Sequence, residues 1–270
     1  MRFDWYQATV KDGSADEVLA RLSRVWDLSS IESIRGQNSY TDGARVYRGD
    51  STLARVYWGG QNGCDPHVIS SSDSSPEVAQ HLRAWHPEHH VTRVDVCEDY
   101  NGVGTWDLMY DGLTAFAAKF RLSTELRGDY LDAKKGRTLY LGAPSSVVRG
   151  RLYEKGHESG HSDKTWVRFE LQVKPKRPAA REYMAKAQPH EAYGLSSWSS
   201  ALYRYFSDEK IERIRAGTLH APTDDQRAYQ HMVKQYGPLL MRLAASEGVE
   251  SVLGRLRRDL FSGVGSWKPN

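Results

Sequence analysis

The chain has 270 residues, of which 26% are charged and 11% aromatic, a composition typical of a folded protein and unlike that of a disordered one. No apolar run approaches the roughly 18 residues of a membrane-spanning helix, and the first residues lack the apolar stretch of a signal peptide. We therefore expect a cytoplasmic protein with no membrane partner. The two cysteines, Cys64 and Cys97, form no CxxC pair, which argues against a structural zinc site or a disulfide.

The net charge is only +3, but basic residues are concentrated in one segment. Between Lys119 and Arg177 there are 14 Lys and Arg against 7 Asp and Glu. Such a segment in a near-neutral protein is what a phosphate-binding face would require. An ordinary solvated surface explains the same charge equally well.

The first part of the chain reads as short strands with one or two helices, and no internal repeat is apparent. Residues 45–60 predict a strand that runs into the Gly59-Gly60 turn. Residues 76–85 predict a short helix with Pro76 in its first turn. Residues 106–120 predict a second helix, which Gly112 weakens.

Four later segments predict strands: residues 91–99, 137–142, 147–155 and 166–174. In three of them, apolar side chains alternate with charged ones. For example, Val167, Phe169, Leu171 and Val173 share one face of the last segment, and charged or polar side chains share the other. This pattern predicts strands that bury one face and expose the other.

After residues 175–178 the pattern becomes helical, with predicted helices at 179–187, 196–206, 207–216 and 223–261. The sequence thus predicts an α+β fold, an antiparallel sheet with helices on one face, followed by an all-helical C-terminal region. We place the boundary between a catalytic domain of residues 1–177 and a helical region of residues 178–270. The helical region is expected to bind DNA or to mediate dimerisation.

The charged faces of the predicted strands carry groups suited to phosphoryl transfer to a tyrosine. Phosphate-binding candidates are Arg93, Arg149, Arg151, Arg168 and Lys174. Tyr153 is the candidate nucleophile, and because a phenol has a pKa of about 10, a base or cation must stabilise its anion. Asp95 and Glu170 are candidate ligands of Mg²⁺ or Mn²⁺. Glu158 is a candidate third ligand or base, and Lys155 could stabilise the phenolate or the phosphate.

Each of these residues also has a structural interpretation. A tyrosine in a strand usually contributes to packing, and Asp95 or Glu170 could simply pair with a neighbouring arginine. Tyr130 and Tyr140 are close enough in sequence to Tyr153 to be alternative nucleophiles.

The motifs RVDVCED, GRTLYLGAPSSVVRGRLYEKGHE and WVRFELQVK, which fall in order within residues 91–174, resemble the replication initiation factor family. That family includes initiators of rolling-circle plasmids, proteins of filamentous phages and relaxases of conjugative elements. The resemblance implies a fold akin to the HUH endonucleases, with a metal held largely by acidic residues. It implies that Tyr153 attacks one DNA strand, leaving a 5′-phosphotyrosine link and a free 3′-OH. The sequence departs from the HUH class because it has no His-hydrophobic-His triplet.

The leading hypothesis is therefore a rolling-circle replication initiator that acts on single-stranded or origin DNA. Its expected partners are a host helicase and polymerase, and a homodimer is a candidate assembly. A conjugative relaxase would use the same chemistry. Two other hypotheses remain: a DNA-binding repressor without catalysis, and a metal-dependent nuclease that uses water as its nucleophile.

Overall fold

The computed structural model describes residues 1–24, 29–60, 63–128, 135–207 and 224–262. The chain forms two compact units, Met1–Gly217 and Thr218–Asn270. Each unit is described by itself.

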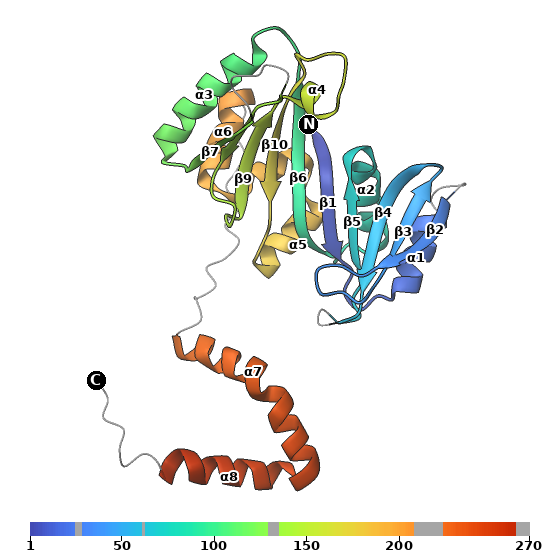
Figure 1. Ribbon diagram of the computed structural model, residues 1–270, viewed down its shortest axis with the longest axis vertical. Coiled ribbons are helices and arrows are strands. Elements are labelled where there is room, and N and C mark those ends of the chain that lie inside the picture. Colours follow the sequence, from blue (N-terminus) through green and yellow to red (C-terminus); the bar gives the residue numbers. More distant parts are fainter. Residues whose placement is uncertain (25–28, 61–62, 129–134, 208–223, 263–270) are drawn as a thin grey trace. The chain divides into compact units, whose positions relative to one another are not determined.

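The first unit is built on one ten-stranded antiparallel sheet with the strand order β2-β3-β4-β5-β1-β6-β10-β9-β8-β7 (Figure 1). Its strands are β1 (Arg2–Thr9), β2 (Ser29–Arg35), β3 (Asp42–Arg48), β4 (Ser51–Trp58), β5 (His67–Ser71), β6 (His90–Tyr100), β7 (Thr124–Arg127), β8 (Thr138–Leu141), β9 (Val148–Tyr153) and β10 (Val167–Val173). The long strands β1 and β6 pair at its centre.

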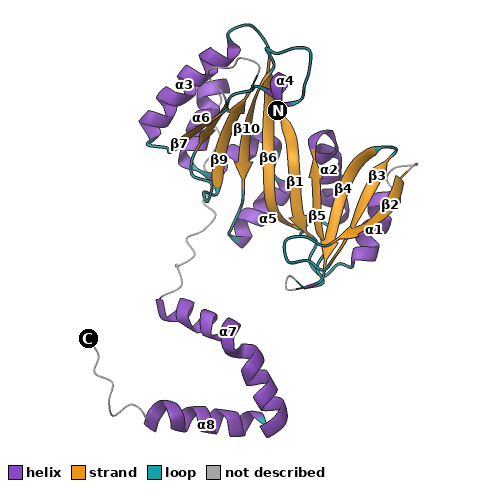
Figure 2. Ribbon diagram, viewed as in Figure 1, coloured by secondary structure: helices purple, strands orange, loops and turns teal. Residues whose placement is uncertain are grey.

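Helices cover one face of this sheet and leave the other face open (Figure 2). They are α1 (Ala15–Arg24), α2 (Ser75–Trp85), α3 (Thr105–Phe120), α5 (Pro178–Lys186), the 3-10 helix η3 (Pro189–Leu195) and α6 (Ser197–Ser207). The apolar side chains that alternate along the strands, such as Phe169 and Leu171, pack with the helices in a single core. The predicted fold class, an antiparallel sheet with helices on one face and further helices at the C-terminal end, is confirmed.

The two halves of the sheet repeat the same topology. In each half a central strand, β1 or β6, is followed by a helix, three strands that run inward from the outer edge, a strand beside the central one, and a helix. The elements β1, α1, β2, β3, β4, β5 and α2 therefore correspond to β6, α3, β7, β8, β9, β10 and α5. An internal repeat that the sequence did not reveal is thus present in the topology.

The pairing of β1 with β6 shows that the two halves are related by a pseudo-two-fold axis. The register has two irregularities, one at Asp4 in β1 and one at Thr92 in β6. Tyr6 and Val94 lie opposite each other. If the two are treated as equivalent, the irregularity at Asp4 maps onto the one at Thr92, and each of the other residue pairs of the register maps onto another such pair. The axis therefore passes through this pair, and the equivalences of all other sheet positions follow from the register.

The predicted strands at 91–99, 137–142, 147–155 and 166–174 and the helices at 76–85 and 106–120 are confirmed, with ends shifted by one or two residues. Residues 45–60 form parts of two strands, because Gly49, with φ +55°, makes a tight turn between β3 and β4. The predicted helices at 179–187 and 196–206 are also confirmed, whereas residues 208–216 lie outside the described part of the chain.

The boundary expected after residue 177 requires correction, because it falls inside the first unit. Helices α5 and α6 bury Met184 and Leu202 completely in the core beneath the sheet. Their apolar side chains complete the cover of the β-sheet, so these helices cannot be separated from it.

The second unit contains α7 (Asp224–Glu247), with Pro238 inside it, and α8 (Val249–Ser262). Gly248, with φ +84°, separates the two helices where one continuous helix was expected. Among the described residues, no helix is both long and apolar enough to cross a membrane.

Candidate active site

The open face of the sheet brings Tyr153, Glu170 and Arg151 into one hydrogen-bonded cluster. Tyr153 and Arg151 lie two residues apart on β9, and Glu170 lies directly opposite Arg151 on β10. The Tyr153 hydroxyl donates to Glu170 Oε1 at 2.5 Å, and Arg151 donates to Glu170 Oε2 at 2.6 Å. The Arg151 guanidinium also lies over the Tyr153 ring, 4.2 Å from its centre.

Burial controls the protonation of this cluster. Tyr153 and Glu170 are each only 3% exposed. Burial and the negative charge of Glu170 raise the pKa of Tyr153 well above its usual value. Burial also raises the pKa of Glu170, and the neighbouring carboxylate of Asp95 adds to this rise, against the opposing effect of Arg151. Glu170 is therefore more basic than an exposed carboxylate, as suits a group that accepts a proton.

Asp95 lies beside this cluster on β6. It faces Gln172, which is two residues from Glu170 on β10, so Asp95 and Glu170 are diagonal neighbours on one face. Arg93 holds Asp95 through two hydrogen bonds, with Nε 2.9 Å from Oδ1. Arg93 in turn lies over the ring of Trp5 on β1, 4.5 Å from its centre.

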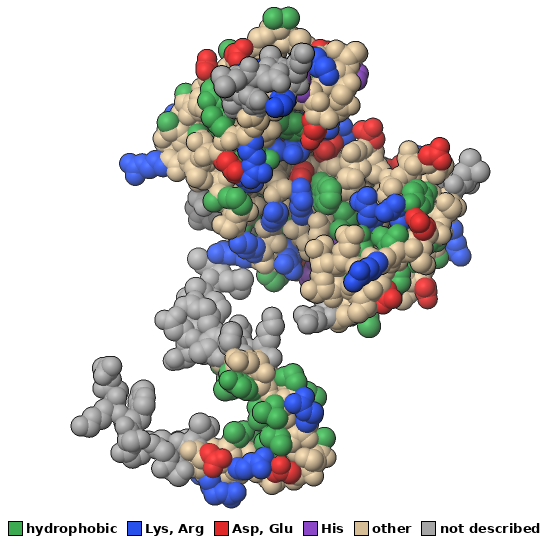
Figure 3. All heavy atoms as spheres, in the orientation of Figure 1, with side chains coloured by type: hydrophobic (Ala, Val, Ile, Leu, Met, Phe, Trp, Pro, Cys, Tyr) green, Lys and Arg blue, Asp and Glu red, His purple; other side chains and the backbone are tan. Residues whose placement is uncertain are grey.

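A cavity of about 160 Å³ lies on the open face next to this cluster. It is lined by Arg93, Asp95, Tyr140, Arg149, Gly150, Arg151, Glu170 and Gln172. Three arginines and two carboxylates thus meet at one small polar depression, to which four different strands contribute. In Figure 3, Lys and Arg side chains gather with acidic ones over the middle of this face.

The donor set at the cavity fits a hard divalent cation. Asp95 and Glu170 supply carboxylate oxygens, and the Gln172 amide can supply a third oxygen. Mg²⁺ typically uses only one or two protein carboxylates and completes its coordination with water and substrate phosphate. In the described part of the chain, however, no cluster of three or more acidic, His or Cys side chains forms a ready-made metal site.

The remaining predicted residues, Lys155, Glu158, Arg168 and Lys174, are not among those that line the cavity. Lys174 follows β10, and burial together with Arg93 lowers its pKa. Lys155 lies over the Tyr153 ring, with Nζ 5.6 Å from its centre. Glu158 on the short helix α4 (Lys155–Glu158) is largely exposed, pairs with Lys155 at 2.7 Å and does not line the cavity.

Arg168 does not lie where a phosphate-binding residue was expected. It is 3% exposed, and its guanidinium donates to Asp99 and to Asp4 at 2.7–2.9 Å. Arg168 thus forms a buried ion-pair cluster with Asp99 and Asp4, here called the Arg168 clamp, which links β10 to β6 and β1. The expectation of a direct phosphate contact is therefore corrected to a structural role.

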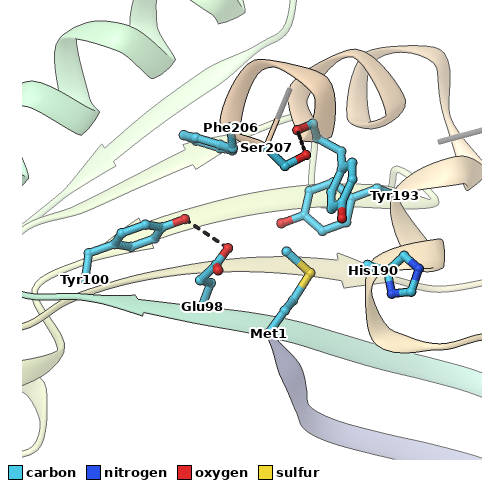
Figure 4. A pocket seen from close by; sticks show the side chains of 8 residues that line it. Met1, Glu98, Tyr100, His190, Tyr193, Phe206 and Ser207 are labelled. Atoms are coloured by element: carbon cyan, nitrogen blue, oxygen red, sulfur yellow. Dashed lines mark hydrogen bonds between the residues drawn. The ribbon is translucent and has the colours of Figure 1, made fainter. Parts of the chain in front are cut away.

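A second cavity, of about 400 Å³, lies on the helix-covered side of the sheet between β6 and the segments η3 and α6 (Figure 4). Glu98 and Tyr100 reach into it from β6, and the Tyr100 hydroxyl donates to Glu98 at 3.0 Å. Tyr193 and Phe206 line its other side. Among the described residues, no Lys or Arg lines this cavity.

Sequence reasoning did not single out Gln172 and Trp5. The alternation of β10 placed Gln172 on the polar face, but the predicted site was built from charged side chains and Tyr153, and Gln172 is uncharged. Trp5 lies far from the other site residues in sequence, and only the pairing of β1 with β6 brings it opposite Asp95. No local signal in the sequence could have revealed that contact.

Comparison with known proteins places this site in context. A search of curated proteins found no match. Among solved structures, a rolling circle replication initiator protein from Geobacillus stearothermophilus matches with a TM-score of 0.53 and 19% identity, over 78% of this chain and 97% of that one. This likeness concerns the fold. The family model described as replication initiation factor matches residues 90–252, a range that includes Tyr153, Glu170 and Arg151. The chain therefore belongs to the replication initiation factor family, as its motifs predicted.

Proposed function

We propose that this protein initiates rolling-circle DNA replication as a metal-dependent, site-specific single-strand endonuclease and strand transferase, with Tyr153 as its covalent nucleophile. The observation that carries the proposal is the short hydrogen bond from Tyr153 to Glu170, set among arginines in the part of the chain that matches the family. A buried phenol of raised pKa needs a base to remove its proton, and the Glu170 carboxylate, whose own pKa is raised, accepts a hydrogen bond from that hydroxyl.

In the proposed reaction, the Tyr153 oxygen attacks the scissile phosphorus while Glu170 Oε1 accepts the phenolic proton. The bond between phosphorus and the 3′ oxygen breaks, and that oxygen takes up a proton to become a free 3′-OH. The product is a 5′-phosphotyrosine, which conserves a phosphodiester bond. Reversal of the step with another 3′-OH rejoins the strand without ATP.

Arg151 is proposed to control access to the nucleophile. In the described state it covers the Tyr153 ring and occupies Glu170 Oε2. A bound phosphate would compete for this guanidinium, because bidentate binding of phosphate is among the strongest interactions that arginine makes. Movement of Arg151 toward the phosphate would uncover the phenol. Arg149 and Arg93 line the same cavity, and in the proposed complex they hold the flanking phosphates.

A divalent cation is part of the proposal. Asp95 and Glu170 would hold Mg²⁺ or Mn²⁺, with Gln172 as a further oxygen donor. When bound, the cation supplies neutralisation of the charge that develops on the scissile phosphate. Glu158, which pairs with Lys155 and does not line the cavity, is proposed only as an accessory ligand or base.

Tyr140 is the alternative nucleophile that a specific observation favours. It lies on β8 directly opposite Arg151, and it lines the cavity, which Tyr153 does not. Arg149 covers its ring at 4.0 Å. Its hydroxyl, however, bonds to no carboxylate among the described residues, whereas that of Tyr153 bonds to Glu170. Tyr130 lies outside the described residues.

The test is incubation of the protein with labelled single-stranded circular DNA of its host element and Mn²⁺, followed by denaturing electrophoresis and peptide mapping. We expect an adduct on the peptide that contains Tyr153, abolished by Tyr153→Phe and retained by Tyr140→Phe. An adduct that survives Tyr153→Phe and disappears with Tyr140→Phe would move the nucleophile to β8. DNA binding without any adduct would favour a non-catalytic repressor, and free 5′-phosphate ends would favour a water-dependent nuclease.

The released 3′-OH would prime synthesis by a host polymerase behind a host helicase. A phage or plasmid initiator is the form of this function that we propose. A conjugative relaxase, which performs the same transesterification, is the alternative within the same chemistry.

A further inference from the structure

The pseudo-two-fold axis assigns each catalytic position a counterpart in the first half of the sheet, which lies outside residues 90–252 of the family match. With Tyr6 equivalent to Val94, Gln7 corresponds to Asp95. The strand registers then make His67 the counterpart of Glu170 and Arg55 the counterpart of Arg149. The carboxylates of the second half are thus replaced by neutral side chains, while an arginine is kept.

The neutral side chains form a chain of hydrogen bonds. Trp5 Nε1 donates to Gln7 Oε1 at 3.1 Å, and Gln7 Nε2 lies 2.7 Å from His67 Nε2. Because Gln7 is the donor there, His67 Nε2 accepts, and its Nδ1 donates to Thr9 Oγ1 at 2.9 Å. Burial lowers the pKa of His67 to about 4, which keeps the ring neutral. This cluster has no negative charge that would repel a phosphate or attract a metal.

A row of residues leads from the cavity across this half at right angles to the strands. Consecutive paired positions on β6, β1, β5, β4 and β3 are Arg93, Gln7, Ile69, Arg55 and Arg45. At about 4.8 Å per strand, the distance from Arg93 to Arg45 is about 19 Å. Figure 3 shows a second group of Lys and Arg side chains over the strands of this half.

The arginines of this row differ in their hydrogen-bond and ion-pair partners. Arg45 donates to the Tyr47 hydroxyl at 2.7 Å and lies 3.9 Å from Glu32, at the far end of the row. The side chain of Arg55, between Arg45 and the cavity, makes no hydrogen bond or ion pair with any residue that the structure describes. An arginine on an open sheet face without a carboxylate partner is available to an anion.

We propose that this row, from Arg93 past Trp5 and Gln7 to Arg55 and Arg45, is a binding track for the single-stranded DNA next to the nick. The inference rests on the proposed function, since it takes the cavity as the place where the strand is cut. The track is the non-catalytic duplicate of the active face. It keeps arginine for the phosphates and replaces the metal-binding carboxylates with uncharged groups.

Two observations favour a single strand over a duplex. The track is one row of side chains wide, which matches one phosphate backbone. It also includes Trp5, half-buried beside the cavity with Arg93 over its ring, and aromatic and guanidinium planes are surfaces on which unpaired bases stack.

The test measures binding rather than cleavage, in the Tyr153→Phe background of the full chain, by fluorescence anisotropy with oligothymidylates of about 6 and 18 nucleotides. We expect Arg55→Gln to weaken binding of the longer strand roughly tenfold at low salt, to reduce its salt slope by about 0.7, and to lower the affinity ratio of the longer to the shorter strand. Arg48→Gln is the matched control, because Arg48 is also on β3–β4 but pairs with Glu77 on the helix side. It should leave both affinities unchanged.

Equal losses of DNA affinity in Arg55→Gln and Arg48→Gln would contradict the proposed track, because they would show that only the total charge of the protein matters. So would no loss from Arg55→Gln, or a loss seen with a hairpin duplex but not with the single strand. The result is separable from the proposed function. A parent protein that forms no adduct would refute the nicking reaction, whereas the effect of Arg55→Gln on binding reports on the track alone.

Discussion

Among the individual residues, Glu170 is the one that connects the proposed nucleophile to an arginine. One of its carboxylate oxygens accepts from the Tyr153 hydroxyl and the other accepts from Arg151. Replacement by Gln keeps the size of the side chain but removes its ability to take a proton. We expect Glu170→Gln to slow adduct formation by roughly 10²–10⁴-fold while DNA binding persists. The rate of the parent protein should rise with pH as Glu170 loses its proton, and the variant should lose this limb of the profile.

Glu125→Gln is the control for that experiment. Glu125 is also a carboxylate paired with an arginine on the open face, with Arg149 at 2.7 Å, but it lies outside the cavity. Adduct formation at the parental rate in Glu170→Gln would rule out Glu170 as the base.

Two buried histidines make the stability of the first unit depend on pH. His67 and His89 both have their pKa lowered by burial to about 4, against 6.5 in an unfolded chain. The unfolded state therefore binds protons more readily between these values. The contribution of each ring is complete above about pH 6.5 and is lost as the pH falls toward 4, by about 2 kcal/mol per histidine between pH 7 and 5.

Urea unfolding at several pH values measures this effect, and His89→Gln isolates one ring. His89 Nδ1 donates to the His86 carbonyl, so Nε2 accepts from the Tyr6 hydroxyl at 2.6 Å, and the Gln amide oxygen can replace it as the acceptor. We expect the variant to lose about half of the pH dependence. An unchanged dependence would show that His89 is not buried as a neutral ring.

At the scale of the elements, Arg168 joins the three central strands. It donates from β10 to Asp99 on β6 and to Asp4 on β1. Its removal would leave two partly buried carboxylates without their cation, and we expect Arg168→Met to lower the free energy of unfolding by about 2–3 kcal/mol.

The matched variant is Arg127→Met. Arg127 pairs with Glu125 at the exposed outer strand β7. Urea unfolding should show no measurable change there, because an exposed ion pair contributes little. A similar loss in both variants would mean that the clamp is no stronger than a surface pair.

The strands and helices themselves were largely predictable. Alternation on β6, β9 and β10 showed which side chains share a face, because successive residues of a strand point to opposite sides. The same alternation could not show that Arg168 is buried. That depends on Asp4, which lies 164 residues earlier in the chain and meets Arg168 only because β1, β6 and β10 lie side by side.

At the scale of the whole molecule, the first unit should fold and act without the second. Residues Met1–Gly217 form their own compact unit with a single core. The second unit exposes large apolar side chains, among them Tyr236, Met241 and Val249, at 49%, 75% and 59%. Exposed apolar residues in such number on a helix pair are typical of an association surface.

We therefore expect a chain of residues 1–217 to unfold cooperatively and to form the Tyr153 adduct. We also expect the full chain to self-associate and the shortened chain to be monomeric in light scattering. Loss of cooperative unfolding in the shortened chain would show that the second unit completes the core. A monomeric full chain would leave the helix pair free for DNA.

The sequence by itself determined the fold class, the family and the list of charged residues on the open face, because periodicity and short motifs are local properties of the chain. The tertiary structure decided which of these residues act together. It placed the Tyr153 hydroxyl against Glu170 and buried Arg168 against Asp99. It also paired Glu158 with Lys155, outside the lining of the cavity. It alone revealed the repeat of the two halves, because the register between β1 and β6 is a relation between distant segments. The sequence diverges at equivalent positions such as Asp95 and Gln7, whereas the backbone pairing that relates them is kept.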